Sequence, residues 1–242
     1  MEKSKRRRKV RSLSKGKAGP RRLSIGVVLI GGIALVAVAI ALVLAVVSGN
    51  QQSTGGAAVY AGIPPEWQNR NILGDPEAPV TVQAWEDFRC PACAAFNQMV
   101  KPRLVESYIA GGQAKLEFRH FPLQQHEPGA SMAAQASECA ADQGQFWSYH
   151  DRVFQETQSG PSAFIAEKLI EYAVELELNE ASFSSCLLDQ THLGGVNASL
   201  QAARAAGLGG TPAVLIDGIP VTNPLDYDAV AAAIDNRLSA GR

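Results

Sequence analysis

The fold is decided by the stretch WEDFRCPAC, residues 85–93, because the sequence pattern changes inside it. The preceding residues, 78–85, form a β-branched run that suits a buried strand. Beyond the motif, apolar side chains recur at helical spacing as far as Tyr108. A helix is therefore predicted to begin near Cys90, which places Cys90 and Cys93 at a strand-to-helix junction.

This position predicts redox chemistry for the cysteine pair. Two cysteines three positions apart on a first helical turn can close a disulfide, and Cys90 meets the unpaired N–H groups and partial positive charge of the helix N-terminus. Cysteines in such motifs have pKa values lowered to roughly 3.5–7.5, and the thiolate is the species that attacks in disulfide exchange. We expect Cys90 to be the nucleophile and Cys93, one turn inward, the resolving cysteine. Pro91 suits the first helical position, where its missing N–H costs nothing.

A C-x-x-C pair can also be half of a zinc site or an inert structural bridge. The sequence has no second C-x-x-C, because the other two cysteines, Cys139 and Cys186, are 47 positions apart. The four histidines are distributed between residues 120 and 192. We therefore expect neither a metal nor another cofactor.

The rest of this region continues as an α/β pattern. Residues 114–121 alternate as a second strand, so the unit reads β-α-β. Residues 127–206 are mostly helix-forming and interrupt the sheet. The sequence then predicts a strand over 212–216, a turn at 217–218 and a last helix over 226–238.

A second informative motif is GGTP, residues 209–212, directly before the late strand. Proline is excluded inside strands but is accepted at the first residue, and an X–Pro bond can adopt the cis form. A cis bond between Thr211 and Pro212 would turn Thr211 toward a neighbouring loop. An ordinary trans proline is the alternative, but the β-α-β pattern with C-x-x-C favours the cis form.

The N-terminal part has a different composition. The first 22 residues carry 11 Lys or Arg and one acidic residue, whereas residues 49–242 carry 11 basic and 22 acidic residues.

Residues 25–47 have no charge and would extend about 35 Å as a helix, enough to cross a hydrocarbon core of about 30 Å. By the positive-inside rule the tail, 1–24, stays cytoplasmic and the remainder is exported. A cleaved signal peptide is the alternative, but the apolar run exceeds the usual length. The tail is not expected to bind nucleic acid.

Residues 48–71 begin with a Ser-, Gly- and Gln-rich stretch and are predicted to be a flexible linker to a folded domain over 72–242. That domain resembles the thioredoxin superfamily, and in it the DsbA-like branch with its membrane-anchored bacterial forms. The resemblance covers about residues 72–238. It rests on WEDFRCPAC, on FRHFPL (118–123), on residues 133–154 and on GTPAVLIDG (210–218).

The resemblance implies a thioredoxin-like α/β fold with a helical subdomain inserted over about 127–206. It also implies a nucleophilic Cys90, a resolving Cys93 and a substrate-binding loop at Thr211 and Pro212. Ala92 stands where the best-known oxidases have histidine, which removes one donor near the thiolate.

Two further sets of residues leave alternatives open. Cys139 and Cys186 lie in the helical insertion, and in an oxidising compartment they are most simply a structural disulfide; two buried free thiols or a second redox pair are the alternatives. Glu86 and Asp87 precede Cys90, and an acid there could shuttle protons. We favour the simpler interpretation that these two acids cap and solvate the strand end.

Together these features predict a single-pass membrane protein whose exported domain is an enzyme that exchanges disulfides with exported cysteine-containing polypeptides, acting as an oxidant. The resemblance implies a membrane re-oxidant of the DsbB or vitamin K epoxide reductase type. A thiol reductase or isomerase, for example in cytochrome c maturation, and a non-redox peptide-binding chaperone are the alternatives.

Overall fold

The structure is a computed structural model that describes residues 60 and 62–241. The chain divides into two units, residues 1–52 and 53–242, and all described residues belong to the second. No helix in this described part is long and apolar enough to cross a membrane. The transmembrane helix predicted over residues 25–47 lies outside the described residues.

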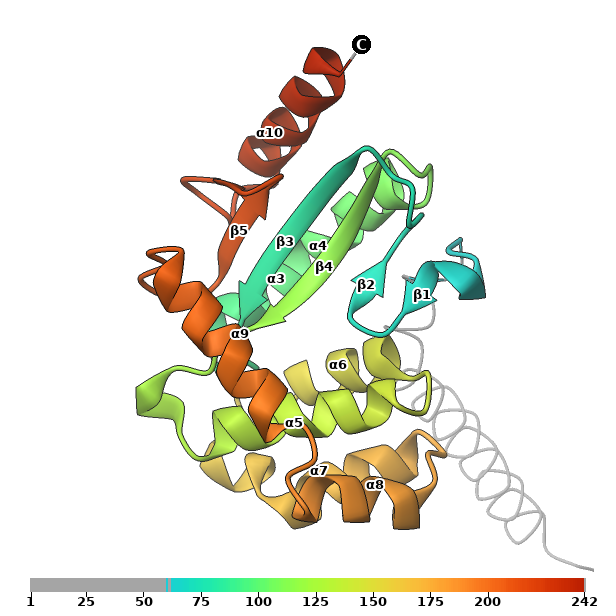
Figure 1. Ribbon diagram of the computed structural model, residues 1–242, viewed down its shortest axis with the longest axis vertical. Helices are drawn as coiled ribbons and strands as arrows, with labels where there is room; N and C mark the ends of the chain where they lie inside the picture. The colour runs from blue at the N-terminus through green and yellow to red at the C-terminus, as the bar shows by residue number, and fades with distance from the viewer. Residues whose placement is uncertain (1–59, 61, 242) are drawn as a thin grey trace, which may run out of the picture. The chain divides into compact units, whose positions relative to one another are not determined.

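A six-stranded mixed sheet forms the centre of the second unit, in the order β1-β2-β4-β3-β5-β6 (Figure 1). Its two longest strands, β3 (Val80–Glu86) and β4 (Ala114–His120), run parallel, so the chain must cross over between them. β5 pairs antiparallel with the other side of β3. The shorter strands are β1 (Gln68–Asn69), β2 (Ile72–Leu73), β5 (Ala213–Ile216) and β6 (Ile219–Pro220).

The crossover from β3 to β4 is broken, although the apolar spacing predicted one continuous helix. α3 (Pro91–Met99) is followed by α4 (Lys101–Leu104) and then by a π-helical turn (Val105–Ile109). Pro102 accounts for the break, because it has no N–H to donate to the carbonyl four residues earlier and its ring clashes with that carbonyl.

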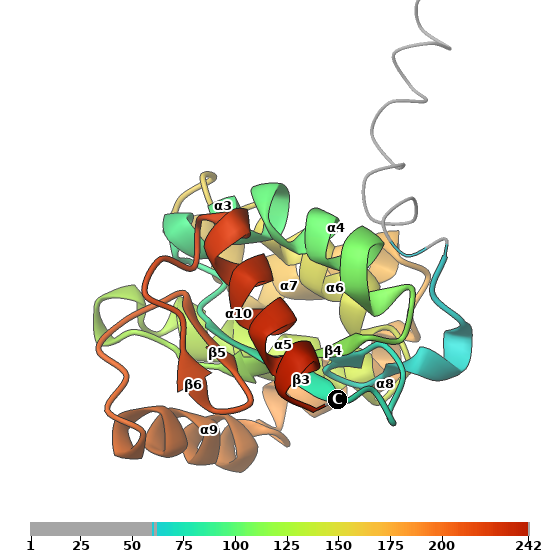
Figure 2. The same cartoon turned by 90° about the horizontal axis from the view of Figure 1, so that it is seen from above.

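Helices cover the two faces of the sheet unequally. α3, α4 and α10 (Tyr227–Ala240) lie on one face, and α9 (Leu193–Ala205) lies on the other (Figure 2). Alternate residues of β4 are buried along its whole length, as strand geometry requires, whereas β3 alternates only at its start and ends in three buried residues. On the α9 side a small apolar cluster forms at the carboxyl end of β3. Its buried members are Trp85, Phe121, Ala203 and Leu215.

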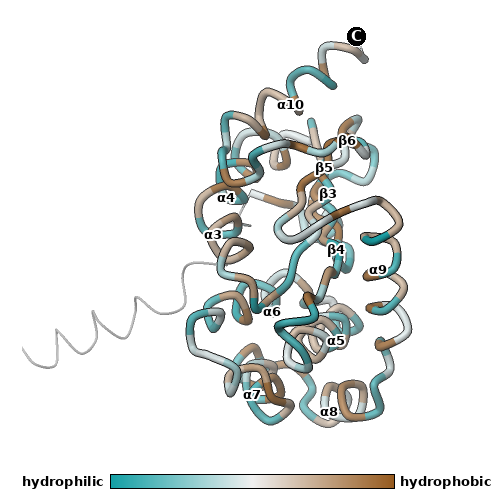
Figure 3. Tube along the Cα trace, turned by 90° about the vertical axis from the view of Figure 1, so that its left-hand side faces the viewer, coloured by the Kyte–Doolittle hydropathy of each residue, from teal (hydrophilic) through white to brown (hydrophobic). Residues whose placement is uncertain are grey.

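The helical insertion packs beside the sheet and below it in the view of Figure 1. Its helices before α9 are α5 (Gly129–Ala141), α6 (Phe146–Phe154), α7 (Ala166–Glu175) and α8 (Glu180–Leu188). The tube in Figure 3 shows α5 between α8 and α3. A disulfide between Cys139 and Cys186 joins α5 to α8.

The packed unit reaches further toward the N-terminus than the linker prediction of 48–71. Tyr60 and Ile63 are buried, a 3-10 turn covers Pro65–Trp67, and β1 follows it. The Tyr60 hydroxyl accepts a hydrogen bond from the buried Lys101 ammonium at 2.8 Å. These contacts could not be read from the local sequence, because the partner of Tyr60 lies 41 residues further along the chain.

Candidate active site

Cys90 caps the N-terminus of α3, and Cys93 lies in its first turn. Cys90 ends the loop after β3 with extended backbone, and Pro91 occupies the first helical position, as the sequence predicted. Cys93 has no exposed surface, whereas Cys90 is 6% exposed. Both are free thiols. The outer sulfur is therefore Cys90.

The loop before β5 lies against this sulfur. The Thr211–Pro212 peptide bond is cis. The Cys90 thiol donates a hydrogen bond to the Thr211 carbonyl at 3.4 Å. Two segments 121 residues apart thus meet at one atom. A second cis bond, Glu127–Pro128, begins the helical insertion and had no clear signal in the sequence.

The two cysteines have opposite acidities. A hydrogen bond from the Cys93 side chain lowers the pKa of Cys90 to about 5. Burial opposes this effect, whereas the Thr211 side chain and the backbone N–H groups of Cys93 and Ala92 support it. Burial, the neighbouring Cys90 and the Glu86 carboxyl raise the pKa of Cys93 far above its ordinary value. At neutral pH the reduced pair therefore holds a thiolate at Cys90 and a thiol at Cys93.

Glu86 is buried under this pair, with 2% exposure, so its interpretation as a solvated strand end is wrong. Asn97 donates one hydrogen bond to the Glu86 carboxyl at 2.5 Å and another to the Cys93 carbonyl at 3.0 Å. Burial raises the pKa of Glu86 to about 8, although Lys101 and Asn97 act in the opposite direction. Glu86 therefore keeps its proton at neutral pH.

Asp87 is also buried, and it holds the loop after β4 against the active site. Its carboxylate accepts hydrogen bonds from the backbone N–H of Arg89 at 2.8 Å and of Leu123 at 2.9 Å. It also lies 2.7 Å from Nδ1 of His126. The role of Asp87 is to fix the backbone around the cysteine motif.

A buried polar cluster that the sequence reasoning missed lies next to Glu86. Lys101 is 2% exposed, and its ammonium lies 2.5 Å from the Asp151 carboxylate and 3.4 Å from Nδ1 of His150. A signal was present, because Cys93, Asn97 and Lys101 follow one another at intervals of four, which is one helix face.

One group of side chains has the composition of a metal site. Cys139, Cys186 and His192 place their possible ligand atoms within 4.8 Å of one another. The two sulfurs are joined in the disulfide, so neither is available as the thiolate that zinc requires.

The fold and this site define a DsbA-like thiol:disulfide oxidoreductase of the thioredoxin superfamily. The family model described as Thioredoxin matches residues 67–236, so the chain belongs to the thioredoxin family. Among relatives, it is 29% identical to a probable disulfide bond formation protein D of Bacillus anthracis, over 78% of this chain and 85% of that protein.

Two other similarities are informative. The oxidised BdbD structure from Bacillus subtilis has a TM-score of 0.65 at 24% identity, over 71% of this chain and 94% of that one. The chain is also 32% identical, over 74% of its length, to the Na(+)/H(+) antiporter NhaA 3 of Salinispora tropica. It spans only 26% of that antiporter, so the similarity concerns one part of a longer protein.

Proposed function

We propose that this protein forms disulfides in exported polypeptides, with Cys90 as the sulfur that bonds to the substrate and Cys93 as the resolving cysteine. The observation that carries the proposal is the opposite acidity of the two sulfurs, a pKa of about 5 at Cys90 and a strongly raised one at Cys93. A stable Cys90 thiolate favours the reduced form of the enzyme, which makes the disulfide form a better oxidant.

The exchange follows from this asymmetry. A substrate thiolate attacks the Cys90 sulfur of the Cys90–Cys93 disulfide, and Cys93 leaves and takes up a proton. A second substrate thiolate then attacks the mixed disulfide, and Cys90 leaves as a thiolate. Two electrons pass from the substrate dithiol to the enzyme. The loop at Thr211 and cis-Pro212 lies beside Cys90, where it can pair with the extended backbone of the substrate.

We further propose that the chain is anchored with a cytoplasmic tail, 1–24, a membrane helix, 25–47, and an exported domain. Support comes from the uncharged 23-residue run and the charge asymmetry around it. Anchoring would hold the enzyme near a quinone-linked re-oxidant of the DsbB or vitamin K epoxide reductase type. In cells, the intact chain should remain in the membrane pellet after carbonate extraction and be digested by protease added outside. Release by carbonate, or protection from the protease, would contradict this arrangement.

The test of direction is the reduction potential of Cys90–Cys93 in the full-length protein, titrated with glutathione. Peptide mass spectrometry follows Cys139 and Cys186 separately. We expect a value near or above about −180 mV, in the range of oxidants. A value near or below about −270 mV would place the protein with reductants and overturn the oxidant role. The Cys90→Ser variant should lose all exchange activity. If the unaltered protein protects client proteins but catalyses no exchange, a chaperone role is favoured instead.

A further inference from the structure

The second cysteine pair lies at the opposite ends of its helices from Cys90. Cys139 is the third residue from the end of α5, and Cys186 is the third from the end of α8. A helix C-terminus carries partial negative charge, which disfavours a thiolate there. The dithiol form of this pair is therefore less favourable than that of Cys90–Cys93, and electrons should flow from Cys139 and Cys186 to an active-site disulfide.

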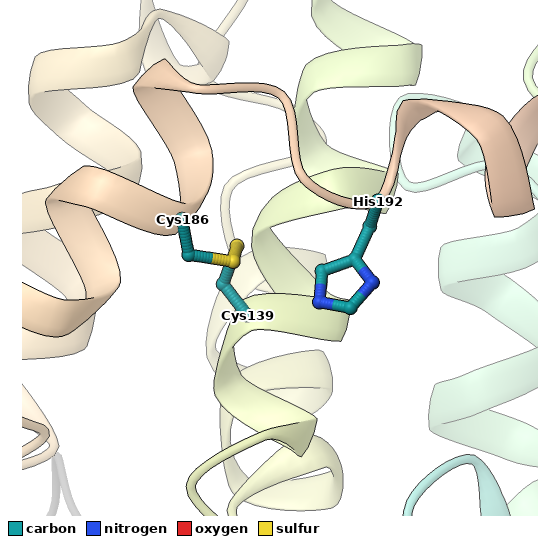
Figure 4. A group of neighbouring side chains, drawn as sticks. All are labelled: Cys139, Cys186 and His192. Atoms are coloured by element: carbon teal, nitrogen blue, oxygen red, sulfur yellow. A yellow bond between two sulfur atoms is a disulfide. The ribbon is translucent and has the colours of Figure 1, made fainter.

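His192 faces the Cys139–Cys186 disulfide (Figure 4), within 4.8 Å of both sulfurs. Its Nε2 lies 2.6 Å from the Asp142 carboxylate, and the same carboxylate oxygen lies 3.9 Å from the Cys186 sulfur. Arg70 holds the other Asp142 oxygen at 2.8 Å. A sulfur, an imidazole and an orienting carboxylate are the arrangement that activates a cysteine nucleophile.

One arginine and two acids bond to one another beside this histidine. Arg70 bonds to Glu138 as well as to Asp142, and both acids belong to the α5 side of the site. Partial burial alone would raise the pKa of Asp142, but Arg70 and His192 hold this pKa below its usual value. Asp142 therefore stays ionised at neutral pH and fixes the His192 ring beside the sulfurs.

The two sulfurs differ in access, as Cys90 and Cys93 do. Cys139 is 1% exposed, whereas Cys186 is only partly buried. A pocket of about 340 Å³ opens beside them and is lined by both cysteines. Its other lining residues are Asp142, Gln143, Asn179 and Ser182. An external sulfur can therefore reach Cys186, and Cys139 is placed to resolve the resulting bond.

The two cysteine pairs of one molecule are not placed to exchange with each other. Cys90 lies at the start of α3 against the Thr211 loop, while Cys139 and Cys186 bridge α5 and α8. In Figures 1 and 3, α8 lies on the far side of α5 from α3. Exchange between the pairs thus requires two molecules.

We propose that the Cys139–Cys186 disulfide is formed by a second copy of this chain, with Cys186 as a nucleophile activated by His192 and Cys139 as its resolving partner. The inference rests on the proposed oxidant function and names one client of it, the protein itself.

The Cys186 thiol gives its proton to His192, and the thiolate attacks the Cys90 sulfur of the second copy, whose Cys93 leaves and takes up a proton. His192 then releases this proton to solvent and takes the proton of the Cys139 thiol, which attacks the Cys186 sulfur, and Cys90 leaves as a thiolate. Of the two protons given up by the client pair, one is balanced by the proton that Cys93 takes up and the other goes to solvent. Two electrons pass from the client pair to the active-site pair, and no other oxidant is consumed in the exchange.

The experiment uses full-length protein in both roles. The client is the Cys90→Ser/Cys93→Ser variant, reduced at Cys139 and Cys186. The catalyst is isotopically labelled, oxidised protein of unaltered sequence, so mass separates the two. We expect the client to oxidise at least about tenfold faster than with equimolar glutathione disulfide. His192→Ala in the client should slow this by about tenfold or more and shift its pH profile upward.

The matched control is His126→Ala in the client, which also removes a histidine paired with an aspartate but leaves the second pair untouched. Equal rates for the His192 and His126 variants would overturn the role of His192. A second measurement starts from the folded, oxidised client, because the reduced client could unfold. It follows the rate at which a dithiol reduces the Cys139–Cys186 disulfide, and this rate should also be lower in the His192→Ala variant.

A reduced model protein with several cysteines separates the two proposals. If the catalyst oxidises that protein but not the client, the inference fails and the proposed function stands. If it oxidises neither, the proposed function fails and the inference with it. Oxidation of both, with loss of rate in the His192 variant alone, supports the inference.

Discussion

Reduction of the Cys90–Cys93 pair should change the stability of the folded protein in a pH-dependent way. The pKa of Cys90 is about 5 in the folded, reduced protein, well below its ordinary value near 9. A group with a depressed pKa in the folded state contributes stability that is complete above its unfolded pKa and is lost as the pH falls through its folded pKa. The reduced form should therefore gain stability, relative to the oxidised form, between pH 5 and pH 9.

The magnitude at pH 7 follows from the two pH units above the folded pKa. At 1.4 kcal/mol per unit these correspond to an upper limit of about 3 kcal/mol. Water reaches the outer side of Cys90 and screens part of this interaction, so we expect about 1–2 kcal/mol. The entropic effect of closing the short disulfide loop is the same at both pH values, so the change with pH isolates the thiolate.

The assay is urea unfolding of oxidised and reduced protein at pH 5 and pH 7, with the free energies extrapolated linearly to water. Mass spectrometry must show that Cys139–Cys186 stays closed in both samples. The Cys90→Ser/Cys93→Ser variant reports the pH dependence from all other groups. If the difference between reduced and oxidised protein is the same at pH 5 and pH 7, the stabilised thiolate is refuted.

Three further predictions use the same unfolding measurement. Because the pKa of Glu86 is raised to about 8, burying this group costs folding free energy that grows as the pH rises from about 4.5 to 8. Glu86→Gln should therefore stabilise the protein by on the order of 3 kcal/mol at pH 7 and by much less at pH 5. Equal effects at both pH values would contradict this. Cys186→Ser opens a loop closed over 47 residues and should cost about 4 kcal/mol; an unchanged midpoint would show that the disulfide adds no stability. Lys101→Met leaves the largely buried Asp151 carboxylate, whose side chain is 15% exposed, without its cation and should cost about 3 kcal/mol. A neutral result would mean that water or another group replaces the ammonium.

Much of the sheet was predictable because its signals are local. The β-branched run predicted over 78–85 is β3, and the alternation over 114–121 is β4, each within two residues. The helix boundary at Cys90 was also local, since Pro91 favours the first helical position. The break at Pro102 was available in the sequence as well, but the apolar spacing through it concealed the interruption.

The N-terminal boundary and the charge cluster needed information that no local pattern holds. Tyr60 is buried because it contacts the Lys101 ammonium and the Trp147 ring. Both partners belong to helices that are distant from Tyr60 in sequence. Lys101 is buried because Asp151 neutralises it. A lone lysine on an apolar helix face is expected to reach toward solvent, and only the tertiary partner changes that outcome.

Glu86 and Asp87 show how two adjacent carboxylic acids acquire different tasks. Both are buried, but Asp87 accepts two backbone N–H bonds and lies 2.7 Å from Nδ1 of His126, so its carboxyl group holds the surrounding backbone in place. Glu86 receives one amide hydrogen bond and has no direct ion pair among the described residues, so burial dominates and the carboxyl keeps its proton to about pH 8. A second negative charge beside the Cys90 thiolate is thereby avoided at neutral pH. The helix N-terminus can then stabilise one anion at the active site, and that anion is the leaving group which an oxidant requires.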